Sequence, residues 1–149
     1  MARTTIAELL ARARSGPERL EPAEALAAQR EGALVVDLRS VDERERAGVI
    51  PGALHVPRSV LEWRLDPESE HHNPDACDLE RQVVLVCADG YSSSLAAATL
   101  QELGFGRATD LVGGFKAWAA AGLPTEPGRG RSSGEPAAGE PPGQPPPSP

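Results

Sequence analysis

The sequence has no apolar run long enough to cross a bilayer, and it contains few cysteines. No stretch of about 18 apolar residues occurs anywhere in the chain. The first residues lack the apolar segment of a secretory signal. The two cysteines, Cys77 and Cys87, form no C-x-x-C pair. We therefore expect a cytoplasmic protein with reduced thiols and no membrane contact.

The chain is also poor in basic residues relative to acidic ones. It carries 15 Lys and Arg against 22 Asp and Glu, which gives a formal net charge of −7. Proteins that bind the phosphate backbone usually present a basic surface that displaces counterions. We therefore expect no nucleic-acid partner.

A metal site is not expected either. His71, His72 and Cys77 lie close together in the sequence, but adjacent histidines point in different directions and no fourth ligand follows at a suitable spacing. The surrounding segment, residues 66–80, contains prolines and acidic residues and is typical of an exposed loop. We expect neither a metal nor another cofactor.

The 149 residues suit one domain that buries its own core. We expect an N-terminal helical segment over residues 1–32, a folded domain over 33–125 and a disordered tail over 126–149. The tail is rich in Pro and Gly and has no aromatic or branched aliphatic residue. A role as a ligand for an SH3-like groove is the alternative for the tail.

Two short apolar runs predict the centre of the fold. ALVVDLR at 33–39 and QVVLV at 82–86 have the length and β-branching of strands buried on both faces. Briefer extended segments are expected within 50–57 and 108–112. Helices are expected at 5–15, 22–30, 41–47, 59–64 and 115–121, with a capping box at Ser40 and Glu43 and a left-handed stop at Gly48. A further helix after the second run carries Ala96, Thr99, Leu100 and Leu103 on one face and is closed by Gly104. This alternation predicts an α/β fold with a parallel sheet and helices on both faces.

The few aromatic residues bear on the core. The chain holds two Trp, two Phe and one Tyr. With so few large side chains available, we expect Trp63 and Trp118 to fill the interior.

Cys87 stands between the second predicted strand and the following helix. Ligands of parallel sheets bind beyond the carboxyl ends of the strands. A loop that turns into a helix there directs amide N–H groups inward, and the helix N-terminus adds partial positive charge. These surroundings lower the pKa of a thiol and favour a nucleophilic thiolate. The alternative is an inert, buried cysteine at a strand end.

The residues after Cys87 fit such a loop. Gly90 permits a positive φ or a close backbone approach. Ser92, Ser93 and Ser94 are good helix caps, and their hydroxyls can donate to a sulfur or an oxyanion.

Three motifs resemble those of the rhodanese sulfurtransferase family. CADGYSS at 87–93 resembles the family's C-x-x-G-x-[RS]-S active loop. VVDLR at 35–39 and GVIPGALHVP at 48–57 resemble its DVR and GHIPGA segments, and GGFKAWAAAGLP at 113–124 is similar to its closing GG-x-x-x-W motif. The resemblance implies a single rhodanese domain with about five mostly parallel strands flanked by helices.

The resemblance also implies an activity. Cys87 would take a sulfane sulfur from thiosulfate or another persulfide-type donor, hold it as a persulfide and pass it to a thiophilic acceptor. The sulfur would be bound by the loop residues Ala88, Asp89, Gly90, Tyr91, Ser92 and Ser93. Asp37 and Arg39 would act as a supporting pair that orients neighbouring loops, and Tyr91 would lie at the rim of the loop.

One departure from the family pattern concerns the donor. Members that favour thiosulfate often place basic residues directly after the cysteine, whereas this loop has Ala88 and Asp89. A further negative charge near a dianion is unfavourable, so we expect thiosulfate to be a poor donor. Arg58 and Arg64 are candidates for compensating positive charge.

Two other functions stay open at this point. A phosphatase or arsenate reductase of this fold needs a longer loop ending in an arginine that binds the oxyanion, and no arginine lies between Cys87 and Arg107. A non-catalytic interaction or regulatory module is the second alternative. The physiological donor and acceptor, the oligomeric state and a resolving role for Cys77 are left open.

Overall fold

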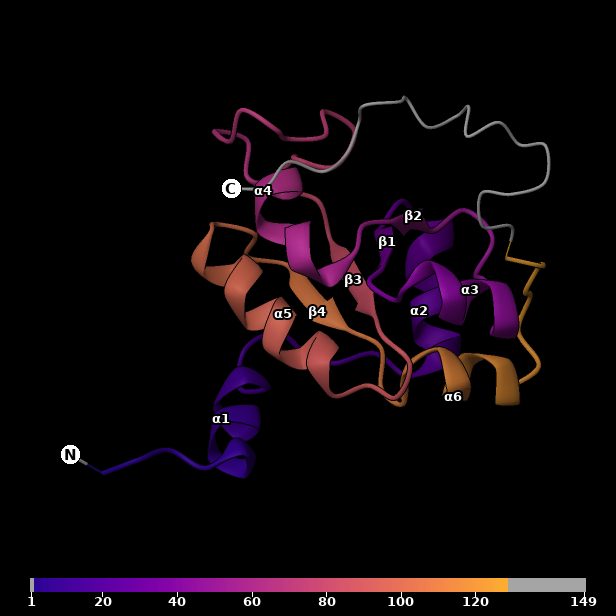
Figure 1. Cartoon of the computed structure of the whole chain (residues 1–149), viewed down its shortest axis with the longest axis horizontal. Helices are drawn as coiled ribbons and strands as arrows, with labels where there is room; N and C mark the ends of the chain where they lie inside the picture. Colours follow the sequence, from indigo (N-terminus) through magenta and orange to yellow (C-terminus); the bar gives the residue numbers. More distant parts are fainter. Residues whose placement is uncertain (1, 129–149) are drawn as a thin grey trace.

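A parallel sheet forms the centre of the molecule (Figure 1). The computed structural model describes residues 2–128. Its strands run in the order β2-β1-β3-β4, with bounds β1 (Leu34–Asp37), β2 (Leu54–His55), β3 (Val83–Val86) and β4 (Ala108–Asp110). All three pairings are parallel, which confirms the predicted α/β class.

The predicted strand number is wrong by one. The described residues form four strands, and in place of a fifth strand Leu20 makes a single parallel bridge to Leu111. Pro17 and Pro22 border this segment. Proline cannot donate to a ladder, and Pro22 already begins a helix, so the pairing stops after one bridge.

Helices cover both faces of the sheet, as predicted (Figure 1). The helices are α1 (Ile6–Ala13), α2 (Pro22–Arg30), α3 (Val41–Ala47), the 3-10 turn η1 (Arg58–Val60), α4 (Leu61–Leu65), α5 (Ser92–Glu102) and α6 (Gly114–Ala120). Helices α4 and α5 pack on one face, and α2 and α6 pack on the other. No helix among residues 2–128 has the length and apolar character that a membrane span requires.

Alternation along the central strands builds two cores. In β3, Leu85 points into the cluster with α4 and α5, whereas Val84 points into the cluster with α2 and α6. Both residues are fully buried. Successive side chains of a strand face opposite sides of the sheet, so this strand is apolar throughout, as its sequence predicts.

The two tryptophans have different environments. Trp118 is fully buried on α6, in agreement with its predicted core role. Trp63 is only partly buried, which corrects the prediction. In the short helix α4, Leu61 and Leu65 are both fully buried. Because residues four apart share a helix face, the inward positions are taken and Trp63 lies beside them.

The helix ends agree only in part with the sequence. The capping box of Ser40 and Glu43 is present at α3. Gly48 follows α3 with φ 98 and ψ 176, so it has a positive φ but not the predicted left-handed helical conformation. The prediction that Ser92 to Ser94 cap α5 is wrong, because Tyr91 occupies the N-cap position and no side chain caps this helix.

The predicted tail begins near the limit of the described residues. Glu126 pairs with Val49 in an antiparallel bridge. The first residue of the predicted tail is therefore bonded to the folded domain. The rest of the tail beyond Gly128 lies outside the described residues. Its predicted disorder stays a prediction, as do the predicted domain boundaries.

The register brings three strand ends together. Asp37 at the end of β1 pairs with Val86 at the end of β3. Asp110 ends β4 on the other side of β3. Since carboxyl ends of parallel strands share one edge, the residues that follow these strands meet there.

Candidate active site

Cys87 lies at this edge, at the floor of a surface hollow of about 280 Å³. Cys87 is 8% exposed, so its sulfur is nearly covered but opens into the hollow. The cysteine loop, which we define as residues 87–93, supplies much of the lining. The lining residues include Leu38, Arg39, Arg58, Ala88, Asp89, Tyr91 and Ser92.

Two groups of the loop contact the sulfur directly. The Gly90 N–H donates to Cys87 Sγ at 3.1 Å, and Sγ lies 3.2 Å from Ser93 Oγ. Gly90 reaches this position with φ 88, a conformation that glycine adopts at little cost.

The balance of these contacts acts on the protonation of the sulfur. Burial raises the pKa of the Cys87 thiol. Hydrogen bonds from the hydroxyls of Ser93 and Ser92, and from the amides of Ser93 and Gly90, outweigh burial and lower this pKa below its ordinary value. The lowered pKa favours the thiolate, which is the nucleophilic form of the side chain.

Removing the Ser93 hydroxyl should therefore make Cys87 less reactive. The Ser93→Ala change raises the pKa of Cys87, so at neutral pH a smaller fraction is thiolate and alkylation by iodoacetamide slows about fivefold, the equivalent of one hydrogen bond. The midpoint of the rate against pH moves upward. Mass analysis of the Cys87 peptide measures the rate.

Ser94→Ala is the matched control for this change. Ser94 Oγ donates to Asp110 and accepts from Arg14, without contacting the sulfur; Arg14 keeps its bond to the Gly90 carbonyl, so the loss of the Ser94 hydroxyl should change the alkylation rate less. Equal slowing in the two variants would show that the hydroxyl contact to the sulfur is not the cause.

The closing GG motif supports the cysteine loop from behind. The N–H of Phe115 donates to the Cys87 carbonyl at 2.8 Å, and that of Lys116 donates to the Ala88 carbonyl at 3.2 Å. These amides belong to the first turn of α6. The loop carbonyls are thus bound on the side of α6, while the amide of Gly90 faces the sulfur.

Asp37 and Arg39 form a buried ion pair next to the site. Arg39 donates to both carboxylate oxygens of Asp37, at 3.0 and 2.8 Å, and also to the Gly48 carbonyl at 2.8 Å. Burial raises the pKa of the Asp37 carboxyl, but the bonds from Arg39 and the nearby Arg44 outweigh burial and hold it below its usual range. The guanidinium of Arg39 also lies over the Phe115 ring at 4.0 Å. The pair thus joins the DLR segment to the GVIPGA segment and to α6.

Asp110 is a site residue that the sequence analysis missed. Its Oδ2 accepts hydrogen bonds from Ser93 Oγ at 2.6 Å and from Ser94 Oγ at 2.9 Å. Arg19 binds the same carboxylate through both oxygens, at 2.8 and 3.2 Å. If the Ser93 hydroxyl turns toward an ionised sulfur, Asp110 keeps the bonds from Ser94 and Arg19. Ser93 has one hydroxyl proton, which it donates to Asp110 in this structure, so it donates to the sulfur only when that bond is given up.

Charges of both signs surround the mouth of the hollow. Asp89 is bound by Lys116 at 2.8 Å, with both side chains mostly exposed. Arg58 lines the hollow, but it pairs with Glu62 at 2.9 Å. Arg64, the other predicted source of positive charge, instead donates to the His71 carbonyl.

The remaining predicted candidates lie apart from one another. Tyr91 is 63% exposed at the rim of the hollow. His72 contacts the Ser69 carbonyl through Nδ1, and Cys77 Sγ lies 3.9 Å from the Pro74 carbonyl. Among residues 2–128, no three His, Cys, Asp or Glu side chains gather as metal ligands do.

Comparisons with known sequences agree with this geometry. The family model for the rhodanese-like domain matches residues 21–121. The thiosulfate sulfurtransferase GlpE of Pseudomonas entomophila is 38% identical over 101 residues, covering 68% of this chain and 84% of that protein. A sulfurtransferase of Allochromatium vinosum is 36% identical over 97 residues, covering 65% of this chain and 81% of that protein.

Solved structures share the fold of this chain. A protein of unknown function from Rhodopseudomonas palustris, described as a possible tyrosine phosphatase, superposes with a TM-score of 0.76 at 37% identity, covering 85% of this chain and 99% of that one. The human single-domain sulfurtransferase TSTD1 superposes with a TM-score of 0.61 at 29% identity, covering 70% of this chain and 97% of that one. The chain therefore belongs to the rhodanese-like domain family and is a rhodanese-type sulfurtransferase.

Proposed function

We propose that this chain moves a sulfane sulfur from a persulfide-type donor to a thiophilic acceptor through a persulfide on Cys87. The observation that carries the proposal is the Gly90 N–H, which donates to Cys87 Sγ at 3.1 Å at the floor of an open hollow. An amide fixed on the sulfur stabilises negative charge there without moving. The relatives named as sulfurtransferases support the same reaction.

The proposed reaction has two steps. In the first, the Cys87 thiolate attacks the outer sulfur of the donor, an S–S bond forms at Cys87, and the rest of the donor leaves with the bonding electron pair. In the second, the acceptor attacks the outer sulfur of the persulfide and Cys87 leaves as thiolate. Cyanide as acceptor gives thiocyanate.

The remaining loop residues would bind the transferred sulfur. We assign this role to Ala88, Asp89, Gly90, Tyr91, Ser92 and Ser93, which form or border the hollow. We assign Asp37 and Arg39 a supporting role, since their ion pair ties the neighbouring segments together.

The charges at the mouth favour a donor that carries less charge than thiosulfate. Lys116 neutralises part of the Asp89 charge, but from an exposed position, where an ion pair has little effect. Arg58 is already paired with Glu62. A dianion therefore finds little free positive charge, and we expect thiosulfate to load sulfur more slowly than glutathione persulfide.

The test is the intact mass of the protein after incubation with thiosulfate, mercaptopyruvate or glutathione persulfide. We expect a gain of one sulfur, about 32 Da, with at least one donor. Cyanide should then restore the original mass and release thiocyanate. An unchanged mass with every donor would favour the non-catalytic module, and hydrolysis of an aryl phosphate would favour the phosphatase.

A further inference from the structure

The outer side of the cysteine loop is held by two arginines from the N-terminal segment. Arg14 Nη2 and Arg19 Nη2 each donate to the Gly90 carbonyl at 2.9 Å. Both residues precede the residues matched by the family model, 21–121. Both arginines therefore lie outside the residues that the family model matches.

Each arginine is itself held in place. Arg14 Nε donates to Ser94 Oγ at 2.9 Å, and its guanidinium lies 5.7 Å from the centre of the Tyr91 ring. Arg19 Nε donates to Asp110 at 2.8 Å. A planar guanidinium that binds two acceptors has its direction fixed.

The backbone next to Arg19 is fixed as well. The N–H of Leu20 donates to the Asp110 carbonyl at 3.1 Å, and the N–H of Val112 donates to the Leu20 carbonyl at 2.9 Å. The hydroxyl of Thr109 donates to the Glu18 carbonyl. The segment is therefore attached to the end of β4, beside the cysteine loop.

Core packing does not account for helix α1, which carries Arg14 at its C-cap. No residue of α1 is buried, and Ile6 and Leu9 are 65% and 41% exposed. The segment contributes little to the core, yet two of its long side chains converge on one carbonyl of the cysteine loop.

The direction of that carbonyl fixes the direction of the next amide. A trans peptide is planar, and its C=O and N–H groups point in opposite directions. The structure contains no cis peptide bond among residues 2–128. The Gly90 carbonyl accepts from both arginines, so the N–H of Tyr91, which belongs to the same peptide group, points away from them.

We propose that Arg14 and Arg19 are positioning residues that clamp the Gly90 carbonyl and thereby aim the loop amides at the transferred sulfur. We call this pair the arginine clamp. The inference rests on the proposed function, in which the sulfur is carried by Cys87. It adds two residues outside the range matched by the family model that set how well the loop binds that sulfur.

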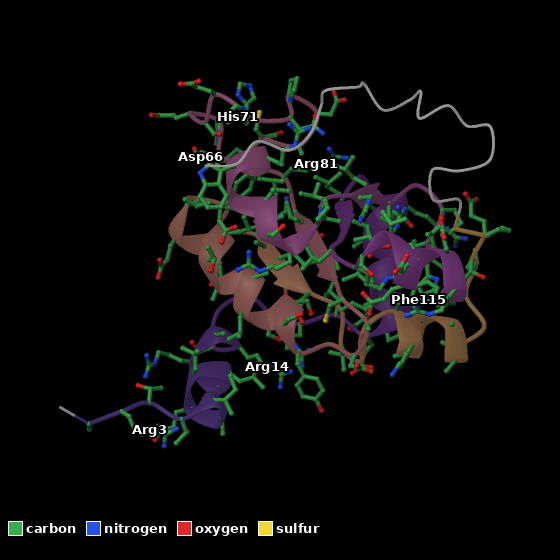
Figure 2. All side chains as sticks on the ribbon, in the orientation of Figure 1. Arg3, Arg14, Asp66, His71, Arg81 and Phe115 are labelled. Atoms are coloured by element: carbon green, nitrogen blue, oxygen red, sulfur yellow. The ribbon has the colours of Figure 1, made fainter. Side chains whose placement is uncertain are left out.

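The test compares Arg14→Gln, Arg19→Gln and the double variant with a matched control. Arg81→Gln is the control, because Arg81 Nε also donates to a glycine carbonyl, that of Gly32, at 2.9 Å. Figure 2 shows Arg81 and Arg14 on opposite sides of the molecule. All variants also carry Cys77→Ser, so that Cys87 is the one cysteine whose loading and alkylation are measured.

Two readouts are measured, the rate of sulfur loading by intact mass and the pH dependence of Cys87 alkylation. In the double variant, sulfur loading should slow about tenfold, because amide N–H groups that no longer point at the sulfur stabilise it much less. The alkylation midpoint should move to higher pH, whereas Arg81→Gln should match the parent protein in both readouts. The inference is overturned if the double variant matches Arg81→Gln in either readout.

Arg19→Lys separates geometry from charge. Lysine keeps the positive charge but lacks the planar fork that bridges Asp110 and Gly90, so we expect it to resemble Arg19→Gln. Full recovery with lysine would overturn the inference. If the double variant does not fold, the single variants carry the comparison, because each keeps one guanidinium on Gly90.

Failure of the proposed function is distinguishable from failure of the clamp. If the parent protein gains no sulfur from any donor, the proposed function is wrong. The alkylation profiles alone then decide whether the clamp orders the loop.

Discussion

Replacing Cys87 with serine should abolish sulfur loading and lower thiocyanate formation about a thousandfold or more, as expected when a nucleophile is removed. A serine hydroxyl is not ionised at neutral pH and forms no persulfide. The contacts that act on the sulfur, from Gly90 and Ser93, would remain without a thiolate to stabilise. Intact mass after donor treatment and thiocyanate release with cyanide both report the loss.

Cys77→Ser is the matched control for this substitution. Cys77 is the other free cysteine, and it lies in the 66–80 loop with its sulfur near the Pro74 carbonyl. We expect the variant to load one sulfur at the rate of the wild type. A loss of loading in Cys77→Ser would contradict the assignment of the transfer to a single cysteine.

The second large effect is expected from Gly90→Ala. Gly90 has φ 88, and an added Cβ would lie 2.6 Å from the Gly113 nitrogen. The loop must move away from α6, which takes the Gly90 amide away from the sulfur. Loss of one such hydrogen-bond donor slows the reaction about a hundredfold. The rate of sulfur loading measures this effect. Urea unfolding measures the accompanying loss of stability.

Gly122→Ala separates the backbone effect from the site effect. Gly122 also has a positive φ, of 76, but nothing lies within 4 Å of an added Cβ. We expect a loss of about 1 kcal/mol in the free energy of unfolding from the unfavourable φ and unchanged loading. If Gly90→Ala loads sulfur as fast as Gly122→Ala, the Gly90 amide does not stabilise the reacting sulfur.

Local sequence patterns predicted the centre of the fold. The strands β1 and β3 consist almost wholly of β-branched and aliphatic residues and are buried on both faces, so each carries its own signal. The strands at the edge of the sheet have a weaker local sequence signal than β1 and β3. Strand β2 is limited to Leu54 and His55, between Pro51 and Pro57, and the expected fifth strand is a single bridge at Leu20.

The position of the cysteine loop was also predictable, because a strand end, a glycine and a helix start adjoin in the sequence. The structure places the Gly90 amide and the Ser93 hydroxyl in contact with the sulfur. The sequence predicts Ser92 to Ser94 as helix caps and as donors to a sulfur or an oxyanion. In the structure they do not cap α5, and Ser93 and Ser94 donate to Asp110.

The outer contacts of the loop were not predictable from one sequence. Arg19 lies 91 residues from Asp110 and 71 from Gly90 in the chain. Such pairs leave no periodicity or motif, because only the packing of the segment along β4 brings them together. Arg14 and Arg19 read as ordinary charged residues of an amphipathic helix and its loop. A signal was present only in Asp110, an acidic residue at the end of a buried strand.

The depth of Cys87 bears on which reactions the site permits. Cys87 is 8% exposed, so a bulky reagent has poor access to it, whereas a second sulfur bonded to Sγ would extend about 2 Å beyond it. Under the proposed mechanism, an incoming thiol meets this outer atom before it meets the one attached to the protein. Attack at the outer atom carries the sulfur away, whereas attack at the inner atom would leave a mixed disulfide. Under the proposed mechanism, the burial of Cys87 would thus favour productive turnover over self-inactivation.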